Sequence, residues 1–312
     1  MNPTVCIIIL NWNNYHDTVS CIQSLRRMSY TNYRVVVVDN GSSNESVKVL
    51  ESIDDSYLIK NEKNLGFAGG NNVAIKYAVE QNFDYVWLLN SDATVEPDCL
   101  EKMVLAVQND SKVGLASPVI YHQDRPDEIQ HCGTRLNSTS DGVDEAADIR
   151  TAEKWQDADS GNVILWGTAL LISTRLIRQI GYLDEKLFAY SEDTDYSLRS
   201  SMAGFKNITV FDASIWHQST TGLRKAHFYY YTARNVGLMW RKYVGGMKFI
   251  KICWWNLNRI AKQLSLMKQH PDLEMACKLG LWDGWVGNGG AFIPRQKLPL
   301  IPRVLFRFFL KA

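Results

Sequence analysis

The chain has 312 residues, with 34 Lys and Arg against 33 Asp and Glu, and 46% of its residues are hydrophobic. This composition is that of an ordinary globular protein and excludes disordered, fibrous and collagen-like classes. At this length, one large α/β domain with an appendage, or two domains, is expected. The six cysteines lie far apart with no CxxC pair, which argues against a zinc ribbon or a disulfide scaffold and favours reduced thiols in a cytosolic protein.

The N-terminal part of the chain predicts strands that alternate with helices. The apolar, β-branched runs that predict buried strands are residues 5–10, 33–38, 57–61 and 84–89. Helices are expected over residues 18–28, with Asp17 as N-cap, and over residues 73–81. Such an alternation is typical of a parallel sheet with right-handed crossover connections.

Polar residues follow three of these strands, at Asn11, Asp39 and Asn90. Ligands of open α/β sheets bind beyond the carboxyl ends of the strands, so these side chains are expected to share one crevice. There Asp39 could accept a hydrogen bond from a base or a ribose hydroxyl, and Asp92 could hold Mg²⁺ or Mn²⁺ together with substrate phosphates. The alternative for both aspartates is an ordinary turn or helix-capping role.

The segment NLGFAGGNN over residues 64–72 predicts a glycine-rich loop. Gly66, Gly69 and Gly70 would let the backbone approach a phosphate or a sugar, and Asn71 or Asn72 could cap the helix that follows. The segment fits neither GxGxxG nor GxxxxGK[ST], so neither a standard dinucleotide-binding domain nor a P-loop is supported.

The middle of the chain is less regular. Residues 121–159 are polar and acidic and predict a surface excursion or an acceptor-side loop, whereas residues 163–173 are apolar and fit either a strand pair or the start of a buried helix.

An acidic cluster, SEDTD over residues 191–195, places three carboxylates in four residues. Repulsion between such close charges raises at least one pKa, so the cluster favours a cation or a proton-transfer role, with Asp193 as the candidate base. Asp193 or Thr194 could also cap a helix over residues 196–203. His217 follows a predicted strand at residues 208–211, where a structural role is the more common alternative to metal binding.

The last 90 residues are strongly basic and aromatic. Residues 223–312 contain 16 Lys and Arg but three acidic residues, and they include FYYY at 228–231 and the pair Trp254 and Trp255. This combination favours contact with an anionic membrane surface over nucleic acid, and the alternative is a basic subdomain that packs on the acidic remainder. No run reaches the ~18 apolar residues of a membrane span, so the region is expected to lie on a membrane.

The motifs in their order resemble those of the family 2 glycosyltransferases of the GT-A fold, in the bacterial rhamnosyltransferase-like branch. These motifs are VCIIILNWN, VVVVDNGSS, NLGFAGGNN, WLLNSDA, WGTALLISTR and GYLDEKLFAYSEDTDYSLR, followed by a downstream His and by YYYTARN. The resemblance implies an α/β domain over residues 1–222, with a Rossmann-like, mostly parallel sheet flanked by helices. A basic helical extension over residues 223–312 would follow it.

The resemblance also implies residue roles. The donor site would comprise Asn11, Asp39, Asn64, Gly66, Gly70, Asn71, Asn90, Ser91 and Asp92, with Asp39 at the nucleobase. Asp92 and His217 would hold Mg²⁺ or Mn²⁺, although Asn90 stands where the family has its first acid. Asp193 would be the general base, supported by Glu192 and Asp195.

The implied activity is an inverting transfer of a sugar in bacterial surface polysaccharide synthesis. The donor would be a nucleoside-diphosphate sugar, dTDP-rhamnose first and a UDP-hexose as the alternative, and the acceptor a lipid-linked saccharide. Arg234, Arg241 and Lys242 would contact the lipid or its diphosphate at the cytoplasmic face of the cell membrane. The rivals are a nucleotidyltransferase and a nucleic-acid-binding protein, and we expect no nucleic-acid partner.

Overall fold

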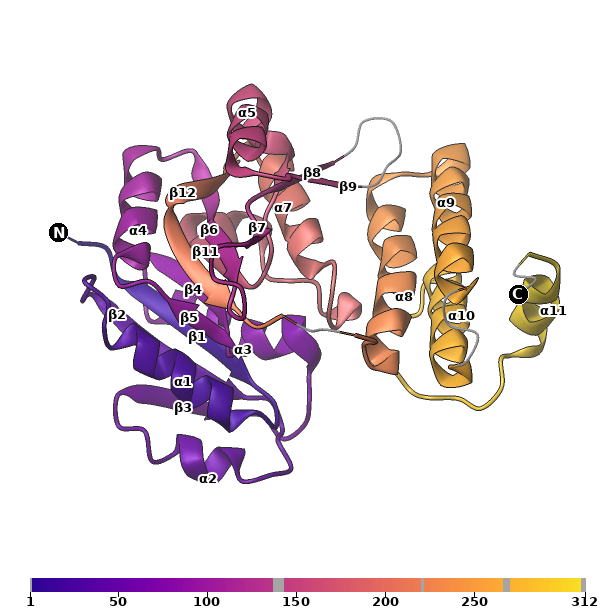
Figure 1. Cartoon of the computed structure of the whole chain (residues 1–312), viewed down its shortest axis with the longest axis horizontal. Coiled ribbons are helices and arrows are strands. Elements are labelled where there is room, and N and C mark those ends of the chain that lie inside the picture. Colours follow the sequence, from indigo (N-terminus) through magenta and orange to yellow (C-terminus); the bar gives the residue numbers. More distant parts are fainter. Residues whose placement is uncertain (1, 137–142, 220–221, 266–269, 310–312) are drawn as a thin grey trace. The chain divides into compact units, whose positions relative to one another are not determined.

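The computed structural model describes residues 2–136, 143–219, 222–265 and 270–309 (Figure 1). The chain divides into two compact units. The sheet unit comprises residues 1–183 and 193–219, and the helical unit comprises residues 184–192 and 220–312. The segment 184–192, which immediately precedes Asp193, therefore packs with the C-terminal helices, although the motifs predict that it belongs with the first 222 residues.

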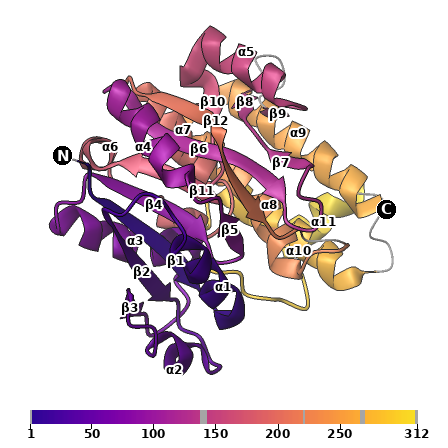
Figure 2. The same ribbon diagram turned by 60° about the vertical axis from the view of Figure 1, so that its left-hand side comes forward.

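The sheet unit is built on one large sheet with the strand order β3-β2-β1-β4-β11-β6-β12-β5, and β7 pairs with β6 (Figure 2). Its strands are β1 (Val5–Asn11), β2 (Tyr33–Asp39), β3 (Ser56–Lys60), β4 (Tyr85–Asn90), β5 (Ala93–Val95), β6 (Val113–His122), β7 (Ile129–His131), β11 (Ala169–Ser173) and β12 (Lys206–His217). Strands β1 to β4 are mutually parallel, as are β6 and β12, whereas β11, β5 and β7 run antiparallel to their neighbours. The predicted mostly parallel sheet is confirmed.

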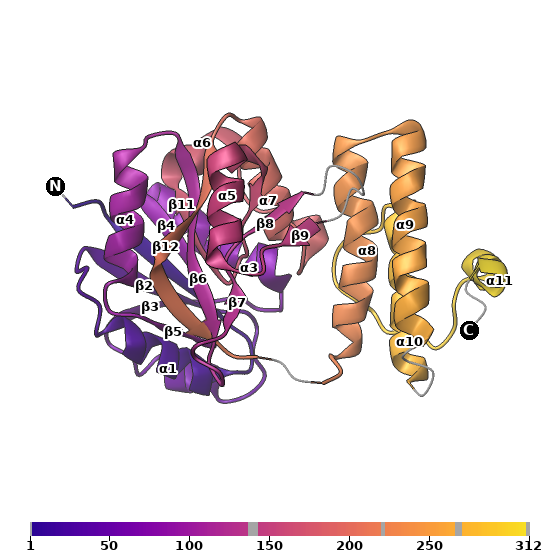
Figure 3. The same ribbon diagram turned by 45° about the horizontal axis from the view of Figure 1, so that its top comes forward.

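Both faces of this sheet are covered by helices, because alternate side chains of a strand point to opposite faces. Ile7 and Ile9 of β1 belong to a core with α1, α2 and α4, whereas Cys6 and Ile8 belong to a core with α3, α6 and α7. Figure 3 shows α4 and α3 at the sheet unit. The helices are α1 (Tyr15–Leu25), α2 (Ser46–Leu50), α3 (Gly66–Glu80), α4 (Cys99–Asn109), α6 (Thr174–Ile180) and α7 (Glu192–Met202). Burial on both faces explains why the strands are continuous apolar runs.

The predicted strands match β1 to β4 to within a residue, but helix ends differ. Helix α1 begins at Tyr15 after the N-cap residue Asn14, so the prediction that Asp17 caps it was wrong. Asp17 lies in the first turn, where its carboxylate accepts a hydrogen bond from Nδ2 of Asn14 (2.5 Å). Helix α7 begins at Glu192, earlier than the predicted residue 196, and β12 extends the predicted strand through His217 itself.

The predicted glycine-rich loop is instead the start of a helix, since α3 begins at Gly66. A Cβ on Gly70 would lie 2.6 Å from Cδ1 of Leu10 and 3.0 Å from Nδ2 of Asn40. Glycine here lets α3 pack closely on the sheet. The expected capping role of Asn71 or Asn72 was wrong, because Asn72 lies inside the helix and exchanges two hydrogen bonds with the backbone of Leu183.

Residues 121–159 are more ordered than the predicted excursion. Besides β7 they contain β8 (Thr134–Leu136), β9 (Val143–Glu145) and α5 (Ile149–Asp159), while residues 137–142 lie outside the described part. Strands β8 and β9 form a small sheet with β10 (Val163–Ile164). Strands of two or three residues are too short to show a period. Residues 163–173 supply β10 and β11, the strand alternative of the prediction, although these two strands belong to different sheets.

The helical unit contains α8 (Ala226–Tyr243), α9 (Gly246–Ser265), α10 (Pro271–Val286) and α11 (Leu300–Phe309), together with the 3₁₀ turn η2 (Glu185–Leu187). Helices α8 and α10 approach closely at glycines. A Cβ on Gly284 would lie 2.5 Å from the carbonyl oxygen of Arg234, and one on Gly237 would lie 2.8 Å from the carbonyl oxygen of Gly284. Within the described residues, none of the helices is both long enough and apolar enough to cross a membrane.

We expect Gly284→Ala to destabilise the helical unit by roughly 1–3 kcal/mol, because the added methyl meets backbone that cannot move aside. Gly245→Ala is the matched control, since a Cβ there meets no atom within 4 Å. Urea unfolding followed by circular dichroism measures both changes. Equal midpoints for the two variants would contradict the close helix contact.

Candidate active site

The parallel pairing of β2, β1 and β4 brings their carboxyl ends to one edge of the sheet. Asn11 pairs in register with Asp39, and Asn90 lies beside Leu10. Nδ2 of Asn11 donates to Oδ2 of Asp39 (2.8 Å), and the backbone N–H of Ser42 donates to Oδ1 (2.9 Å). Asp39 is only 1% exposed. The expected proximity of these residues is thus observed, and both carboxylate oxygens of Asp39 already accept a hydrogen bond.

A second polar network, centred on the buried Asn40, fixes the loop before α3. Nδ2 of Asn40 donates to Oδ1 of Asn64 and to the carbonyl of Gly66 (both 3.1 Å), while its Oδ1 accepts from the N–H of Leu65 (3.0 Å). The turn that follows needs glycine at Gly41, where φ is +72° and a Cβ would lie 2.5 Å from the backbone carbon of Lys63.

Three of the predicted donor-site residues are therefore built into the framework. Asn64 is held by Asn40, whereas Gly70 and Asn71 are buried in α3. Nδ2 of Asn71 donates to the carbonyl of Phe67 in the same helix (2.9 Å). Their observed contacts are with neighbouring protein groups, and their direct contact with a donor stays a prediction.

Asp92 and His217 come together because β5 pairs with the end of β12. Asn90, Ser91 and Asp92 form the turn between β4 and β5, and all three are partly exposed. His217 pairs with Ala93, the residue after Asp92. As a result Nε2 of His217 lies 3.1 Å from Oδ1 of Asp92 and 3.2 Å from Nδ2 of Asn90.

The other ring nitrogen of His217 is oriented by Gln130, a residue of β7. Nδ1 lies 2.8 Å from Oε1 of Gln130. Because that oxygen only accepts, Nδ1 carries a proton. In this tautomer Nε2 has a lone pair, which accepts a hydrogen bond from Nδ2 of Asn90 and lies beside the Asp92 carboxylate. A cation bound between Nε2 and this carboxylate would take the place of the Asn90 hydrogen bond.

This pair fits a divalent cation that is also held by substrate. Carboxylates suit Mg²⁺ and Mn²⁺, and an imidazole whose second nitrogen is held by a polar partner is the usual form of a metal-binding histidine. Among the described residues, no group of three His, Cys, Asp or Glu side chains gathers as a metal site. A cation held by these two side chains would have its remaining positions open to phosphate oxygens and water.

The predicted base, Asp193, lies in the first turn of α7 with its carboxylate held by backbone. The N–H of Gly167 donates to Oδ2 (3.0 Å) and the N–H of Thr194 donates to Oδ1 (2.7 Å). The residue is partly accessible to solvent. Desolvation by the surrounding protein nevertheless raises the pKa of the carboxyl, which strengthens it as a proton acceptor.

Gly167 and Thr168 link the predicted base to the turn that carries Asp92, one of the two predicted metal ligands. Gly167 donates to Asp193, and the next residue, Thr168, accepts a hydrogen bond from the N–H of Asn90 (2.9 Å). Asp193 and Asn90 are thus bound to adjacent residues of one segment, just before β11. Their proximity follows from the position of β11 beside β4 in the sheet.

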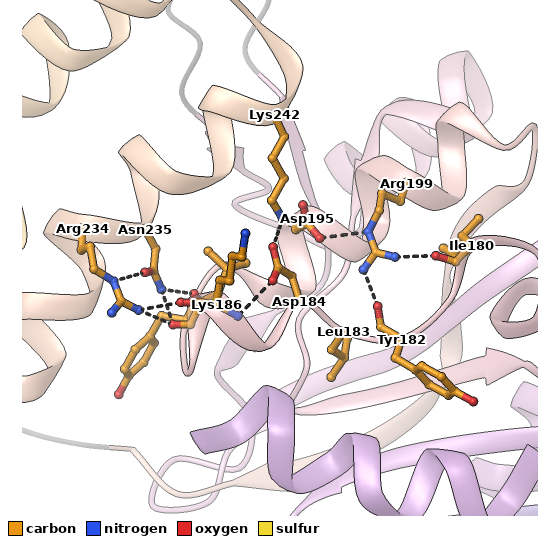
Figure 4. Close-up of polar contacts among 12 residues, drawn as sticks. Ile180, Tyr182, Leu183, Asp184, Lys186, Asp195, Arg199, Arg234, Asn235 and Lys242 are labelled. Atoms are coloured by element: carbon orange, nitrogen blue, oxygen red, sulfur yellow. Dashed lines mark hydrogen bonds and ion pairs between the residues drawn. The ribbon is translucent and has the colours of Figure 1, made fainter. Parts of the chain in front are cut away.

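The other acids of the cluster have different surroundings. Glu192 is 5% exposed and belongs to the helical unit. Asp195 is fully buried in the sheet unit and forms an ion pair with Arg199 (2.9 Å), which also donates to the carbonyls of Ile180 and Tyr182 (Figure 4). Asp195 therefore has a structural role in α7, the helix whose first turn carries the predicted base.

The expected lipid contact of Arg234 was wrong. This side chain is fully buried, and its hydrogen bonds run to Oδ1 of Asn235 and to backbone carbonyls of the helical unit (Figure 4). Lys242 forms an ion pair with Asp184, and Arg241 donates to the carbonyl of Trp285. A cation in a basic segment is thus not necessarily available to a ligand.

Sequence reasoning missed three residues that shape the site: Asn40, Gln130 and Gly167. Asn40 stands beside Asp39 in the turn sequence, so its position after β2 was a usable signal. Gln130 lies in a strand of three residues, and Gly167 acts through its backbone. Neither leaves a pattern in the sequence.

Residues 6–181 match the domain described as glycosyl transferase family 2, so the chain belongs to that family. Among curated proteins, it is 24% identical over 217 residues to dTDP-rhamnosyl transferase RfbF of Shigella flexneri, covering 70% of each chain. It is 36% identical over 93 residues to UDP-Glc:alpha-D-GlcNAc-diphosphoundecaprenol beta-1,3-glucosyltransferase WfgD of Escherichia coli. That match covers 28% of this chain and 37% of the relative.

Solved structures show the same fold. The mannosyltransferase PcManGT from Pyrobaculum calidifontis, in complex with GDP-Man and Mn²⁺, superposes with a TM-score of 0.60 at 16% identity, covering 92% of this chain and 87% of that one. The GT-A fold expected from the motifs is therefore confirmed. The family and this fold define a glycosyltransferase.

Proposed function

We propose that this glycosyltransferase moves a sugar, with inversion, from a nucleoside-diphosphate sugar to a hydroxyl of a lipid-linked saccharide. One observation carries the proposal: adjacent residues of one segment, Gly167 and Thr168, bond to Asp193 and to the turn that contains Asp92. Oδ1 of Asp92 lies 3.1 Å from Nε2 of His217. A base and a cation-binding pair at one sheet edge are what such a displacement requires. The rhamnosyltransferase relative supports dTDP-rhamnose as the donor, and the glucosyltransferase relative supports a UDP-hexose as the alternative.

The proposed chemistry gives each group one task. The acceptor oxygen bonds to the anomeric carbon on the face opposite the diphosphate, and the carbon–oxygen bond to the diphosphate breaks. Asp193 takes the proton of the acceptor hydroxyl. A bound divalent cation would neutralise the charge that develops on the leaving diphosphate. Asp92 and His217 would hold this cation, and the buried Asp39 with Asn11 would contact the base or ribose.

The first test is thermal-shift binding of dTDP, UDP, GDP and CMP, each with Mn²⁺, with Mg²⁺ or with EDTA. We expect stabilisation by dTDP or UDP that EDTA abolishes, with Mn²⁺ more effective than Mg²⁺ because the proposed site includes an imidazole. Asp92→Asn should remove the metal-dependent part. Asp110→Asn, which alters an exposed pair with Lys206 in the same unit, is the control. Metal-independent binding in the wild type would contradict the proposed metal site.

The second test concerns Asp193. We expect Asp193→Asn to lower kcat roughly 10²-fold or more while nucleotide binding is kept, because the variant lacks only the proton acceptor. The raised pKa adds a prediction for the wild type. Activity should fall as pH drops through the pKa of Asp193, with the acid limb above the ordinary value of about 4. Unchanged turnover in the variant would exclude Asp193 as the base.

The membrane proposal rests on the outer face of α9. Met247, Ile250 and Trp254 follow one another at helical spacing and are 68%, 57% and 55% exposed, and Lys251 is exposed beside them. In α11, Leu300, Ile301 and Val304 are also exposed. Apolar and aromatic side chains with adjacent lysines suit the boundary of an anionic bilayer. A lipid-linked acceptor would be confined to that boundary.

Co-sedimentation with vesicles that contain anionic phospholipid tests this face. We expect Ile250→Ser combined with Trp254→Ser to weaken binding roughly tenfold or more, because two large apolar groups no longer enter the interface. Met202→Ser is the control, since Met202 is 74% exposed in the sheet unit. Equal binding by both proteins would remove α9 from the proposed membrane surface.

A further inference from the structure

The segment just before the proposed base has an unusual backbone. Phe188, Tyr190 and Ser191 have φ values of +64°, +69° and +67°, in the left-handed region that residues other than glycine seldom adopt. At Phe188 the N–H of Ala189 bonds back to the carbonyl of Leu187 (2.7 Å), which makes a γ-turn of the rare, strained type. Such a backbone persists only where its surroundings determine it.

Two buried residues of α8 supply those surroundings. Nη2 of Arg234 donates to the carbonyl of Leu187 (2.7 Å) and lies 3.3 Å from that of Lys186. Nδ2 of Asn235 is within hydrogen-bond distance of the carbonyls of Leu187 (3.0 Å), Ala189 (2.8 Å) and Tyr190 (2.6 Å). Nε of Arg234 donates to Oδ1 of Asn235, which fixes the direction of the amide. Both side chains are 0% exposed.

Aromatic rings of α8 hold the side chains of the same segment. Phe188 stacks on Tyr231 with ring centroids 5.3 Å apart, and Tyr190 meets Phe228 edge to face at 5.1 Å. The guanidinium of Arg234 lies over the ring of Tyr231 at 4.9 Å. A charge buried among carbonyls and rings stabilises little by itself. Its hydrogen bonds do, however, determine the path of residues 186–190.

We propose that Arg234 and Asn235 are positioning residues for the base, an inference that rests on the proposed function. The boundary between the units falls between Glu192 and Asp193, which are consecutive residues. Residues 186–191 lead directly into α7, whose first turn carries the Asp193 carboxylate, so a change in the backbone of the strained turn would be passed along the chain to the base.

Asn235→Ala and Asn256→Ala form a matched pair for the test. Asn256 is 2% exposed in the same unit, and its Nδ2 likewise donates to a backbone carbonyl, that of Ala233 (2.8 Å). Its Oδ1 accepts from Arg259 as that of Asn235 does from Arg234. None of its hydrogen bonds in the described structure involves residues 186–190. Loss of a buried amide should lower the melting temperature of both variants to a similar extent.

The readouts are transfer kinetics with the nucleotide sugar found by the binding panel, and hydrogen exchange of the peptide over residues 186–194. For Asn235→Ala we expect kcat to fall roughly 10²-fold with the donor KM nearly unchanged, because a small misplacement of a base acts on the chemical step. Exchange of the peptide should become faster in this variant alone. Asn256→Ala should keep wild-type kcat and exchange.

The other outcomes separate a failure of the positioning role from a failure of the proposed function. Equal kcat for the two variants overturns the positioning role while the proposed function stands. A wild-type protein that transfers no sugar from any donor overturns the proposed function, and the inference with it. If Asn235→Ala does not fold, Arg234→Lys keeps the charge but loses the planar fork across two carbonyls. Its kcat should fall at least tenfold, and a wild-type kcat would refute the role.

Discussion

The parallel pairing of β2, β1 and β4 is the constraint on which the site depends. Because parallel strands end at the same edge, Asn11, Asp39 and Asn90 lie side by side. The backbone N–H and C=O groups of the loops beyond them then require hydrogen-bond partners. The buried amide of Asn40 provides them for the loop before α3. The polar groups at this edge of the sheet are thus already hydrogen-bonded to one another.

The antiparallel strands β5 and β11 bring the remaining residues of the site to the edge formed by the parallel strands. β5 turns Asp92 back toward the end of β12 and so toward His217, while β11 places Gly167 and Thr168 between Asn90 and Asp193. Two reversed strands therefore bring together residues that are about 100 positions apart in the sequence. The chemistry proposed here needs both, because neither a base nor a cation pair acts alone on a leaving diphosphate.

The basic C-terminal region combines two kinds of positive charge. Arg234 is buried and fixes a strained turn, whereas Lys251 is exposed beside the apolar face of α9. Basic residues of this region therefore have two roles: some fix the internal structure of the unit, and others lie on a surface suited to anionic lipid. Glycines such as Gly284 allow α8 and α10 to pack backbone to backbone.

The sequence by itself determined the fold class, the first four strands and the edge at which Asn11, Asp39, Asn90 and Asp92 gather, because long apolar runs followed by polar turns are local patterns. It also singled out Asp193 and His217 through ordered motifs. The start of α3 at Gly66, the role of Gln130 and the burial of Arg234 depended on tertiary contacts. Whether a glycine lies in a loop or in a helix is decided only when the chain folds. The same holds for whether a cationic side chain faces solvent or buried carbonyl groups. Those outcomes depend on partners far away in the sequence.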